Sequence, residues 1–175
     1  MNLRLVFTLL TLLTLFCCGS PGQKNAIKIQ DENSKVTSGD SSLQTGWYYL
    51  SDANNGYRRQ LDRDTAYYFL NPVPIVTVDN ITTMEIYESN HGGIGLSMQL
   101  DEVGTDLWSV ATDKTTGEYL AFVLNDKLLH VPRVNSQITV GMTALNRGNY
   151  TRQELDEFKK QIEKERRYLI STREK

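Results

Sequence analysis

The hydrophobic pattern is most regular in Gly117–Thr151. Two apolar runs, Leu120–Leu124 and Leu128–Val134, flank the pair Asn125-Asp126. Because Asn and Asp tolerate the left-handed backbone region better than most residues, this pair predicts a two-residue hairpin turn. Pro132 cannot donate to a strand ladder and indicates an edge or a bulge in the returning strand. A third strand is expected to follow and to lead into a capped helix.

Shorter runs before this stretch predict further strands. Trp47–Ser51 and Tyr57–Leu61 flank Asp52–Gly56, whose Asn and Gly residues favour a hairpin turn, so we expect the two runs to pair. Tyr67–Leu70 is another aromatic strand, and the two prolines of Asn71–Pro74 end it.

A second hairpin and a helix come next. Met84–Tyr87 and Ile94–Leu100 alternate in polarity around Asn90–Gly93, which is typical of paired antiparallel strands. Apolar residues then recur at helical spacing, and Asp101 can cap the helix that this spacing predicts. The recurring residues are Val103, Leu107, Val110 and Ala111.

The last helix has the clearest local signal. Thr151 and Glu154 form a capping-box pattern, and Tyr150 can pack on Leu155 across it. The apolar stripe expected to face the core is Leu155, Phe158, Ile162 and Leu169. The elements together predict an α+β fold, mainly antiparallel sheet with two helices packed on it.

The N-terminus indicates export. Arg4 precedes the apolar run Leu5–Phe16, which is shorter than the roughly 20 residues of a membrane span and is typical of a cleaved secretory signal. Cys17-Cys18 then resembles the bacterial lipobox, which implies that Cys18 carries lipid and that the protein is a lipoprotein anchored to a membrane of the cell envelope. The alternative is an ordinary secreted protein.

Composition divides the chain into three parts. Residues 1–18 are the predicted lipoprotein signal, residues 19–45 are polar and predict a flexible tether, and residues 46–175 predict one domain. Without a cysteine after Cys18, that domain contains neither a disulfide nor a cysteine metal cluster. The formal net charge of −2 gives no general attraction for nucleic acid.

The patterns of common catalytic and metal sites are missing. The two histidines are His91, in a predicted hairpin loop, and His130, on a predicted strand, and neither accompanies a nucleophile-elbow motif. Asp62–Asp64 is too short for a calcium loop, and Gly92–Gly95 precedes a strand instead of a helix. We therefore expect no enzyme activity, no cofactor and no metal.

Several turn, glycine and core residues follow one order and spacing. They are Asp79-Asn80-Ile81, Gly104, Thr112, Gly117, Ala121–Leu124, Lys127, Pro132, Asn135, Ile138, Gly141 and Tyr150-Thr151. In this arrangement, residues 66–155 resemble the periplasmic head subdomain of the protein-export translocase subunit SecD. The resemblance implies the head fold, and it implies contact with emerging polypeptide in the periplasm. Two departures are Asn125-Asp126 in place of the family's Asp-Gly turn and an inserted Arg147.

The resemblance leaves two functions open. One is a lipid-anchored, non-catalytic module facing the periplasm that contacts polypeptide or a protein partner, and the other is a structural or small-ligand-binding envelope protein with no export role. An aromatic surface near the N-terminus of the domain is the candidate partner-binding site, although about half of such side chains should face the core. Its residues are Trp47, Tyr48, Tyr49, Tyr57 and Tyr67.

Overall fold

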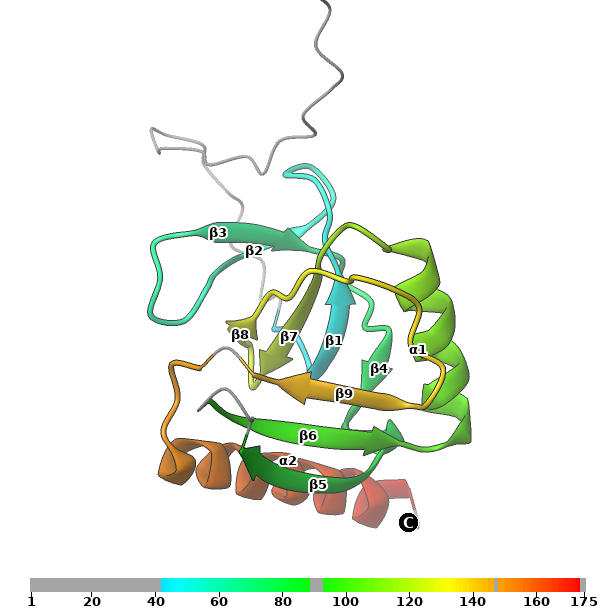
Figure 1. Cartoon of the computed structure of the whole chain (residues 1–175), viewed down its shortest axis with the longest axis vertical. Helices are drawn as coiled ribbons and strands as arrows, with labels where there is room; N and C mark the ends of the chain where they lie inside the picture. The colour runs from blue at the N-terminus through cyan, green and yellow to red at the C-terminus, as the bar shows by residue number, and fades with distance from the viewer. Residues whose placement is uncertain (1–41, 89–92, 147, 174–175) are drawn as a thin grey trace, which may run out of the picture.

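The computed structural model describes residues 42–88, 93–146 and 148–173 (Figure 1). The predicted signal, Cys18, most of the predicted tether and His91 lie outside the described residues. The strands are β1 (Gly46–Tyr49), β2 (Tyr57–Gln60), β3 (Tyr67–Leu70), β4 (Val76–Thr77), β5 (Ile81–Glu88), β6 (Ile94–Leu100), β7 (Leu120–Leu124), β8 (Lys127–His130) and β9 (Met142–Leu145). The helices are η1 (Val78–Asn80, a single 3-10 turn), α1 (Glu102–Lys114) and α2 (Arg152–Arg173).

The central sheet has the strand order β4-β1-β7-β8, and its neighbouring strands are antiparallel. The β7–β8 hairpin is confirmed, with Asn125 at φ 47° and Asp126 at φ 66° in its turn. Strand β8 ends at His130, before the predicted end at Val134. Beyond it, pairing continues as an isolated antiparallel bridge between Tyr119 and Arg133, with the Leu120 N–H donating to the Pro132 carbonyl at 3.2 Å and the Val134 N–H donating to the Glu118 carbonyl at 2.8 Å.

The predicted pairing of the first two strands is wrong. The turn at Asp52–Gly56 forms, with the Gly56 N–H donating to the Asp52 carbonyl at 2.9 Å. However, β1 pairs with β4 and β7 in the central sheet, whereas β2 pairs with β3 in a separate two-stranded sheet. The physical reason is apolar burial: β1 has partners for both of its faces in the centre of the domain, and the polar strand β2, with Arg58 and Arg59, stays outside it.

The third sheet in the described part of the chain has the order β5-β6-β9. It confirms the predicted hairpin, because Met84 pairs with Met98 and Ile86 pairs with Leu96. Strand β9 adds to the other side of β6, with Leu145 opposite Leu96. The third strand predicted ahead of the last helix is therefore present.

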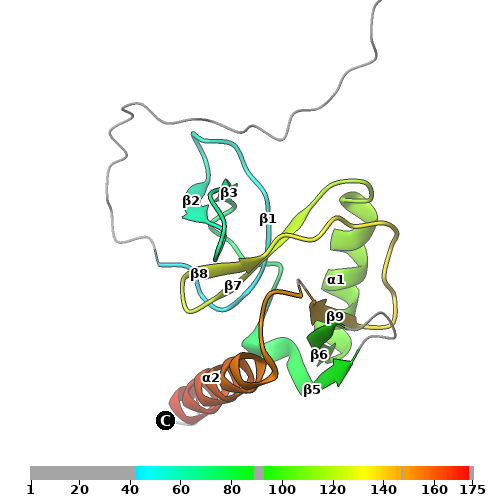
Figure 2. The same cartoon turned by 60° about the vertical axis from the view of Figure 1, so that its left-hand side comes forward.

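Both predicted helix starts are confirmed. The Gly104 N–H donates to Asp101 Oδ1 at 2.6 Å at the start of α1. At the start of α2, the Thr151 N–H donates to Glu154 Oε2 at 2.8 Å and the Glu154 N–H donates to Thr151 Oγ1 at 3.3 Å, which completes the capping box. Helix α2 runs along β5 and β6, and α1 runs beside β4 (Figures 1 and 2).

The core consists of two apolar clusters, one on each face of the central sheet. The larger cluster contains Trp47 and Phe122 with residues of the β5-β6-β9 sheet and both helices. The smaller cluster contains Tyr48 and Leu70 beneath the β2–β3 pair. Leu43 is buried in it as well, so packing begins inside the segment assigned to the tether. The predicted α+β class is confirmed.

Candidate functional site

The structure separates the five aromatic residues predicted to bind a partner. Trp47 and Tyr48 are 2% and 0% exposed, so neither reaches a partner from this position. Their burial has a simple cause: side chains alternate along β1, and both faces of β1 are covered, one by each core cluster. Tyr49 and Tyr57 are half-buried, and Tyr67 is exposed.

Tyr67, the most exposed of the five, already has a neighbour. The Arg58 guanidinium lies 4.0 Å from the centroid of its ring, a cation–π geometry. Both residues belong to the small β2–β3 sheet, whose Tyr57 packs on the smaller core cluster. The five aromatic residues thus do not form one continuous surface.

The exposed apolar surface lies instead on α1. Its buried residues are Gly104, Trp108, Ala111 and Thr112. Of the four apolar residues that recur at helical spacing, only Ala111 is buried, because the helix turns the large Trp108 ring toward Trp47, at 5.0 Å between ring centroids. Val103, Leu107 and Val110 point outward and are 63%, 45% and 66% exposed.

A groove of about 350 Å³ runs beside this exposed stripe. One wall is α1, and the other is Tyr49 with the segment that leads into β4. The lining residues are Tyr49, Pro74, Ile75, Asp106, Leu107 and Val110. The Ile75 N–H donates to the Trp47 carbonyl at 2.7 Å, which fixes the second wall to the central sheet. Val73, just before this wall, is also exposed.

Tyr49 closes the groove next to α1. The Lys114 ammonium lies 4.8 Å from the centroid of its ring, and burial raises the pKa of its phenol. The phenol is therefore neutral throughout the physiological range, and the wall that it forms is aromatic and uncharged. Asp106 is the one carboxylate among the lining residues.

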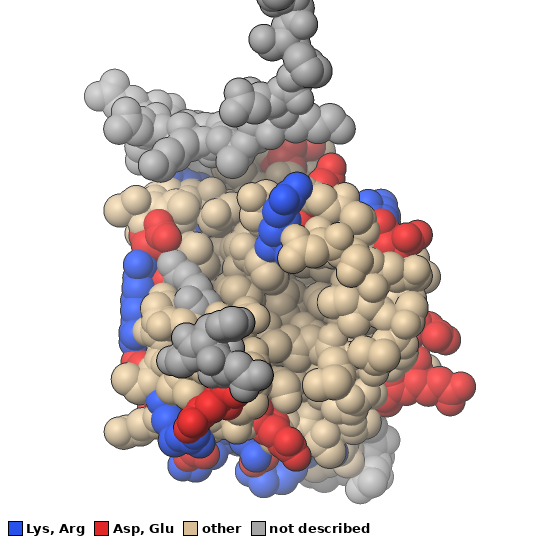
Figure 3. Space-filling view, viewed as in Figure 1, with Lys and Arg blue, Asp and Glu red and all other residues tan. Residues whose placement is uncertain are grey.

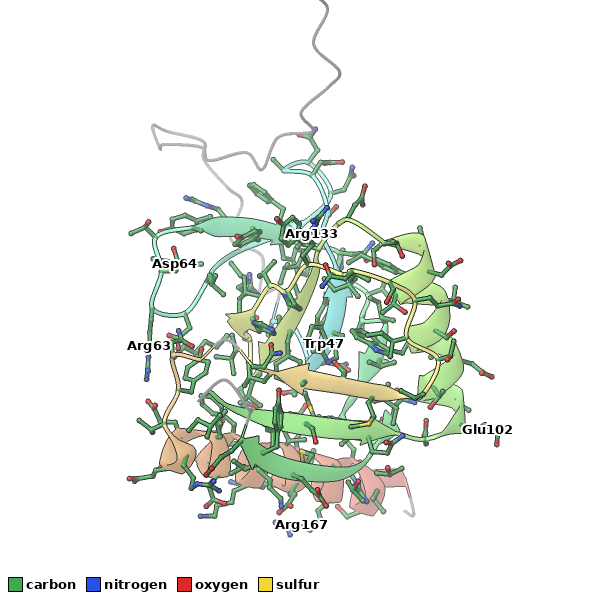
Figure 4. The ribbon with its side chains drawn as sticks, in the orientation of Figure 1. Trp47, Arg63, Asp64, Glu102, Arg133 and Arg167 are labelled. Atoms are coloured by element: carbon green, nitrogen blue, oxygen red, sulfur yellow. The ribbon has the colours of Figure 1, made fainter. Side chains whose placement is uncertain are left out.

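Three carboxylates follow the same side of α1, next to the apolar stripe. Glu102, Asp106 and Asp113 are exposed, and in the described part of the chain none of them forms an ion pair. Acidic side chains project along the edge of the molecule where α1 lies (Figure 3), and Glu102 points away from the domain (Figure 4). The groove is thus apolar inside and acidic along the α1 rim.

A second polar cluster joins the start of α2 to the sheets. Arg63 bonds to Glu154 and donates to the Asn149 carbonyl at 2.7 Å. The hydrogen bond from Arg63 lowers the pKa of Glu154 to about 2, with help from the Thr151 N–H. Burial raises the pKa of Asp62, but hydrogen bonds from Lys127 and Tyr150 outweigh it and leave that pKa below its usual value.

Side chains of this cluster tie the elements together. Lys127 Nζ lies 2.8 Å from Asp62 Oδ1, and the Tyr150 hydroxyl donates to Asp62 Oδ2 at 2.9 Å. Its carboxylates are thus occupied by cations and a phenol. Among residues 42–88, 93–146 and 148–173, no three His, Cys, Asp or Glu side chains converge as metal ligands.

His130 is buried in the larger core region. Its ring stands edge-on to Trp47, at 6.3 Å between ring centroids. His130 is the last residue of β8, where it pairs with Phe122 of β7, and its imidazole belongs to the core. It lies away from the α1 groove, whose lining residues do not include it.

The sequence interpretation missed the groove because its two walls are far apart in the chain. Asn71–Pro74 indicates only the end of a strand, and the apolar spacing on α1 indicates a helix without showing which residues face the core. A usable signal was present: Trp108 with Ala111 forms a second apolar face on the same helix, one residue out of step with the first.

No α-helix in the described ranges is both long and apolar enough to cross a membrane.

Comparison with known proteins identifies the fold. One solved structure, described as "Crystal structure of SecDF in Super-membrane-facing form", is 20% identical with a TM-score of 0.50, over 54% of this chain and 12% of that chain. Another, "Structure and function of a membrane component SecDF that enhances protein export", is 14% identical with a TM-score of 0.54, over 69% of this chain and 63% of that chain. The chain thus corresponds to only part of either protein, and at these identities the likeness concerns the fold alone.

No curated protein sequence matches the chain. The family described as "SecDF, P1 head subdomain" matches residues 54–164, a longer stretch than the 66–155 on which the sequence resemblance rested. That match covers more than half of the chain and confirms the resemblance to the SecD periplasmic head. The chain belongs to the SecDF P1 head subdomain family.

Proposed function

We propose that this protein is a lipid-anchored, non-catalytic binding module of the bacterial cell envelope that contacts polypeptide or a protein partner. The observation that carries the proposal is the apolar groove between α1 and the Tyr49–Ile75 wall, with Val103 and Val110 exposed beside it. Exposed apolar patches rimmed by polar residues commonly mark interaction sites. Family membership supports the same reading, since one solved relative is described as a membrane component that enhances protein export.

The site of attachment belongs to the proposal. Lipid on Cys18 would hold the domain at a membrane, and the 23 residues between Cys18 and Ser42 would let it move over the surface. A periplasm-facing domain fits the location of the family's head subdomain. Mass spectrometry of the mature N-terminus tests this part: diacylated Cys18 as the first residue supports it, and an unmodified different residue contradicts it.

Photo-crosslinking in intact cell envelopes tests the binding role. A photoreactive side chain at Val110, which is 66% exposed beside the groove, is compared with one at Tyr168, which is 67% exposed on α2. We expect protein adducts at Val110 in clear excess over Tyr168. Equal adduct yields at the two positions would count against the groove as the contact surface.

A second candidate is a structural or small-ligand-binding envelope protein without an export role. The groove is open to solvent and has a volume of about 350 Å³, near the lower end of the range of small-ligand pockets, and the ligand version rests on that volume. Native mass spectrometry of the protein purified from its own envelope checks for a bound small molecule. A bound compound that Leu107→Ser releases would support this candidate over the first.

A further inference from the structure

The exposed stripe on α1 has the spacing of a helix-pairing seam. Val103 and Leu107 are four residues apart, and Leu107 and Val110 are three residues apart. Alternating steps of three and four residues place side chains on the narrow line along which one helix packs against another. All three side chains are exposed, so the seam is open in this chain.

Charges flank this seam on one side only. Asp106 and Asp113 are seven residues apart; Asp106 comes directly before the seam residue Leu107, and Asp113 comes directly before Lys114, which continues the seam spacing as a cation over the Tyr49 ring. These are the positions from which charged residues of paired helices select their partner. Glu102 extends the acidic row by one turn, and none of the three carboxylates has an ion-pair partner in the described part of the chain.

We infer that the groove receives an amphipathic helix of a partner protein, whose apolar stripe packs between Leu107 and Ile75 and whose Lys or Arg side chains line the flank facing Asp106 and Asp113. The inference rests on the proposed function and specifies the kind of polypeptide bound. A helix laid in an apolar groove is one of the recurring modes of peptide recognition, with anchors at three- and four-residue steps. Along α1, the seam offers such anchors over about 10 Å, since the seven steps from Val103 to Val110 rise 1.5 Å each.

The acidic row argues against two other occupants. A second copy packed through the same face would bring its own Asp106 and Asp113 toward those of the first, and like charges across a helix pair oppose association. An anionic lipid surface would be repelled in the same way. The chain's own segment Lys24–Ile29 does combine basic and apolar residues, so the experiment must separate it from a partner.

Fluorescence anisotropy with designed peptides tests the inference on the purified full chain in detergent. The first probe is a helical peptide with a leucine stripe and lysines along one flank, the second has glutamates in place of those lysines, and the third has the first composition in scrambled order. We expect the first peptide to bind at least about tenfold more tightly than either of the others. Two or three partly desolvated charge pairs, together with contacts of the leucine stripe, would contribute a difference in binding free energy of this size.

Charge reversal supplies the matched control. Asp106→Lys with Asp113→Lys is expected to reverse the preference, so that the glutamate peptide binds more tightly. Glu118→Lys with Glu157→Lys changes the net charge equally at exposed positions that do not line the groove and is expected to keep the lysine preference. Circular dichroism of each variant confirms that the fold is retained.

Four outcomes would overturn the inference. The first two are equal binding of the lysine and glutamate peptides, and equal effects of the two double variants. The third is tighter binding of the lysine peptide after Ile27→Ser with Ile29→Ser, which would make the chain's own segment the occupant. The fourth is a dimer in sedimentation that Val110→Lys dissociates. If Val110 still crosslinks to a protein in envelopes while the peptides show no preference, the binding role stands and only the partner chemistry is wrong.

Discussion

Adjacent residues on α1 provide a direct test of which way the helix faces. Trp108 is 3% exposed and packs on Trp47, whereas Leu107 is 45% exposed and lines the groove. The perturbations are Trp108→Ala and Leu107→Ala, each made alone. Because the two positions share one helix and one local backbone, differences in helix propensity between the variants are small, and the comparison isolates burial.

The expected costs differ by roughly 2 kcal/mol. Truncating a buried aromatic residue to Ala costs about 3–5 kcal/mol. Among the described residues the buried Trp108 indole N–H has no hydrogen-bond partner. Removing this unsatisfied donor offsets part of that cost, so we expect a value of about 3 kcal/mol. A fully buried Leu→Ala change costs about 2–5 kcal/mol, but Leu107 is only about half covered, which reduces the expected cost to about 1 kcal/mol.

Urea unfolding followed by far-UV circular dichroism measures both free energies of unfolding. Ellipticity reports the whole fold and stays valid when Trp108, a fluorophore, is removed. Val103→Ala is the control for the outer face and is expected to change the free energy of unfolding by less than about 0.5 kcal/mol. A larger loss for Leu107→Ala than for Trp108→Ala would refute the helix orientation and, with it, the groove.

Three further predictions concern the elements around the groove. Thr151→Ala removes half of the α2 capping box and should lower the free energy of unfolding by about 1 kcal/mol in the same urea assay. Gly104→Ala should destabilise the fold by about 1–3 kcal/mol despite the higher helix propensity of Ala, because its Cβ would lie 2.7 Å from Asn80 Cβ; Ser109→Ala, at a half-buried position of the same helix, should change it far less. The pKa of Glu154 is about 2, so the stability gained from its bond to Arg63 is present at pH values above the unfolded pKa of about 4.3 and is lost as the pH falls toward 2. In an NMR titration, Arg63→Gln should raise this pKa toward the unfolded value. An unchanged titration curve would contradict that account.

Local signals in the sequence predicted local structure well. The Asn125-Asp126 turn and the Thr151–Glu154 capping box each depend on a few neighbouring residues, and both form as expected. The β5–β6 hairpin also followed from alternation on either side of a short turn. In these cases the residues that decide the geometry lie next to each other in the chain.

Strand pairing was predicted wrongly where it depends on residues that are distant in the chain. The turn at Asp52–Gly56 is real, yet β1 leaves it to pair with β7, because Trp47 and Phe122 meet in the core at 5.2 Å between ring centroids. The same competition buried Trp47 and Tyr48 on opposite faces. The residues of a turn predict that the chain reverses there, but they do not predict which strand the following segment pairs with.

The orientation of α1 is a second case of this kind. The helix carries two apolar stripes, one with Leu107 and Val110 and one with Trp108 and Ala111, and helical periodicity fits both. Volume separates them: an indole fills the space beside Trp47, whereas the branched aliphatic stripe would leave that space empty. Deciding between the stripes requires knowledge of the cavity that the helix must fill.

Once Trp108 and Ala111 face the core, folding gives no reason for the outer stripe to be apolar. A helix of 13 residues is marginal alone and is held here by its inner face, so polar residues at Val103, Leu107 and Val110 would leave most of that packing intact. Apolar side chains at these positions instead expose hydrophobic surface to water, beside a groove whose opposite wall, Tyr49 to Ile75, is also apolar. The proposed occupant accounts for this stripe, and the carboxylates beside it, which have no ion-pair partner among the described residues, match the basic flank proposed for that occupant.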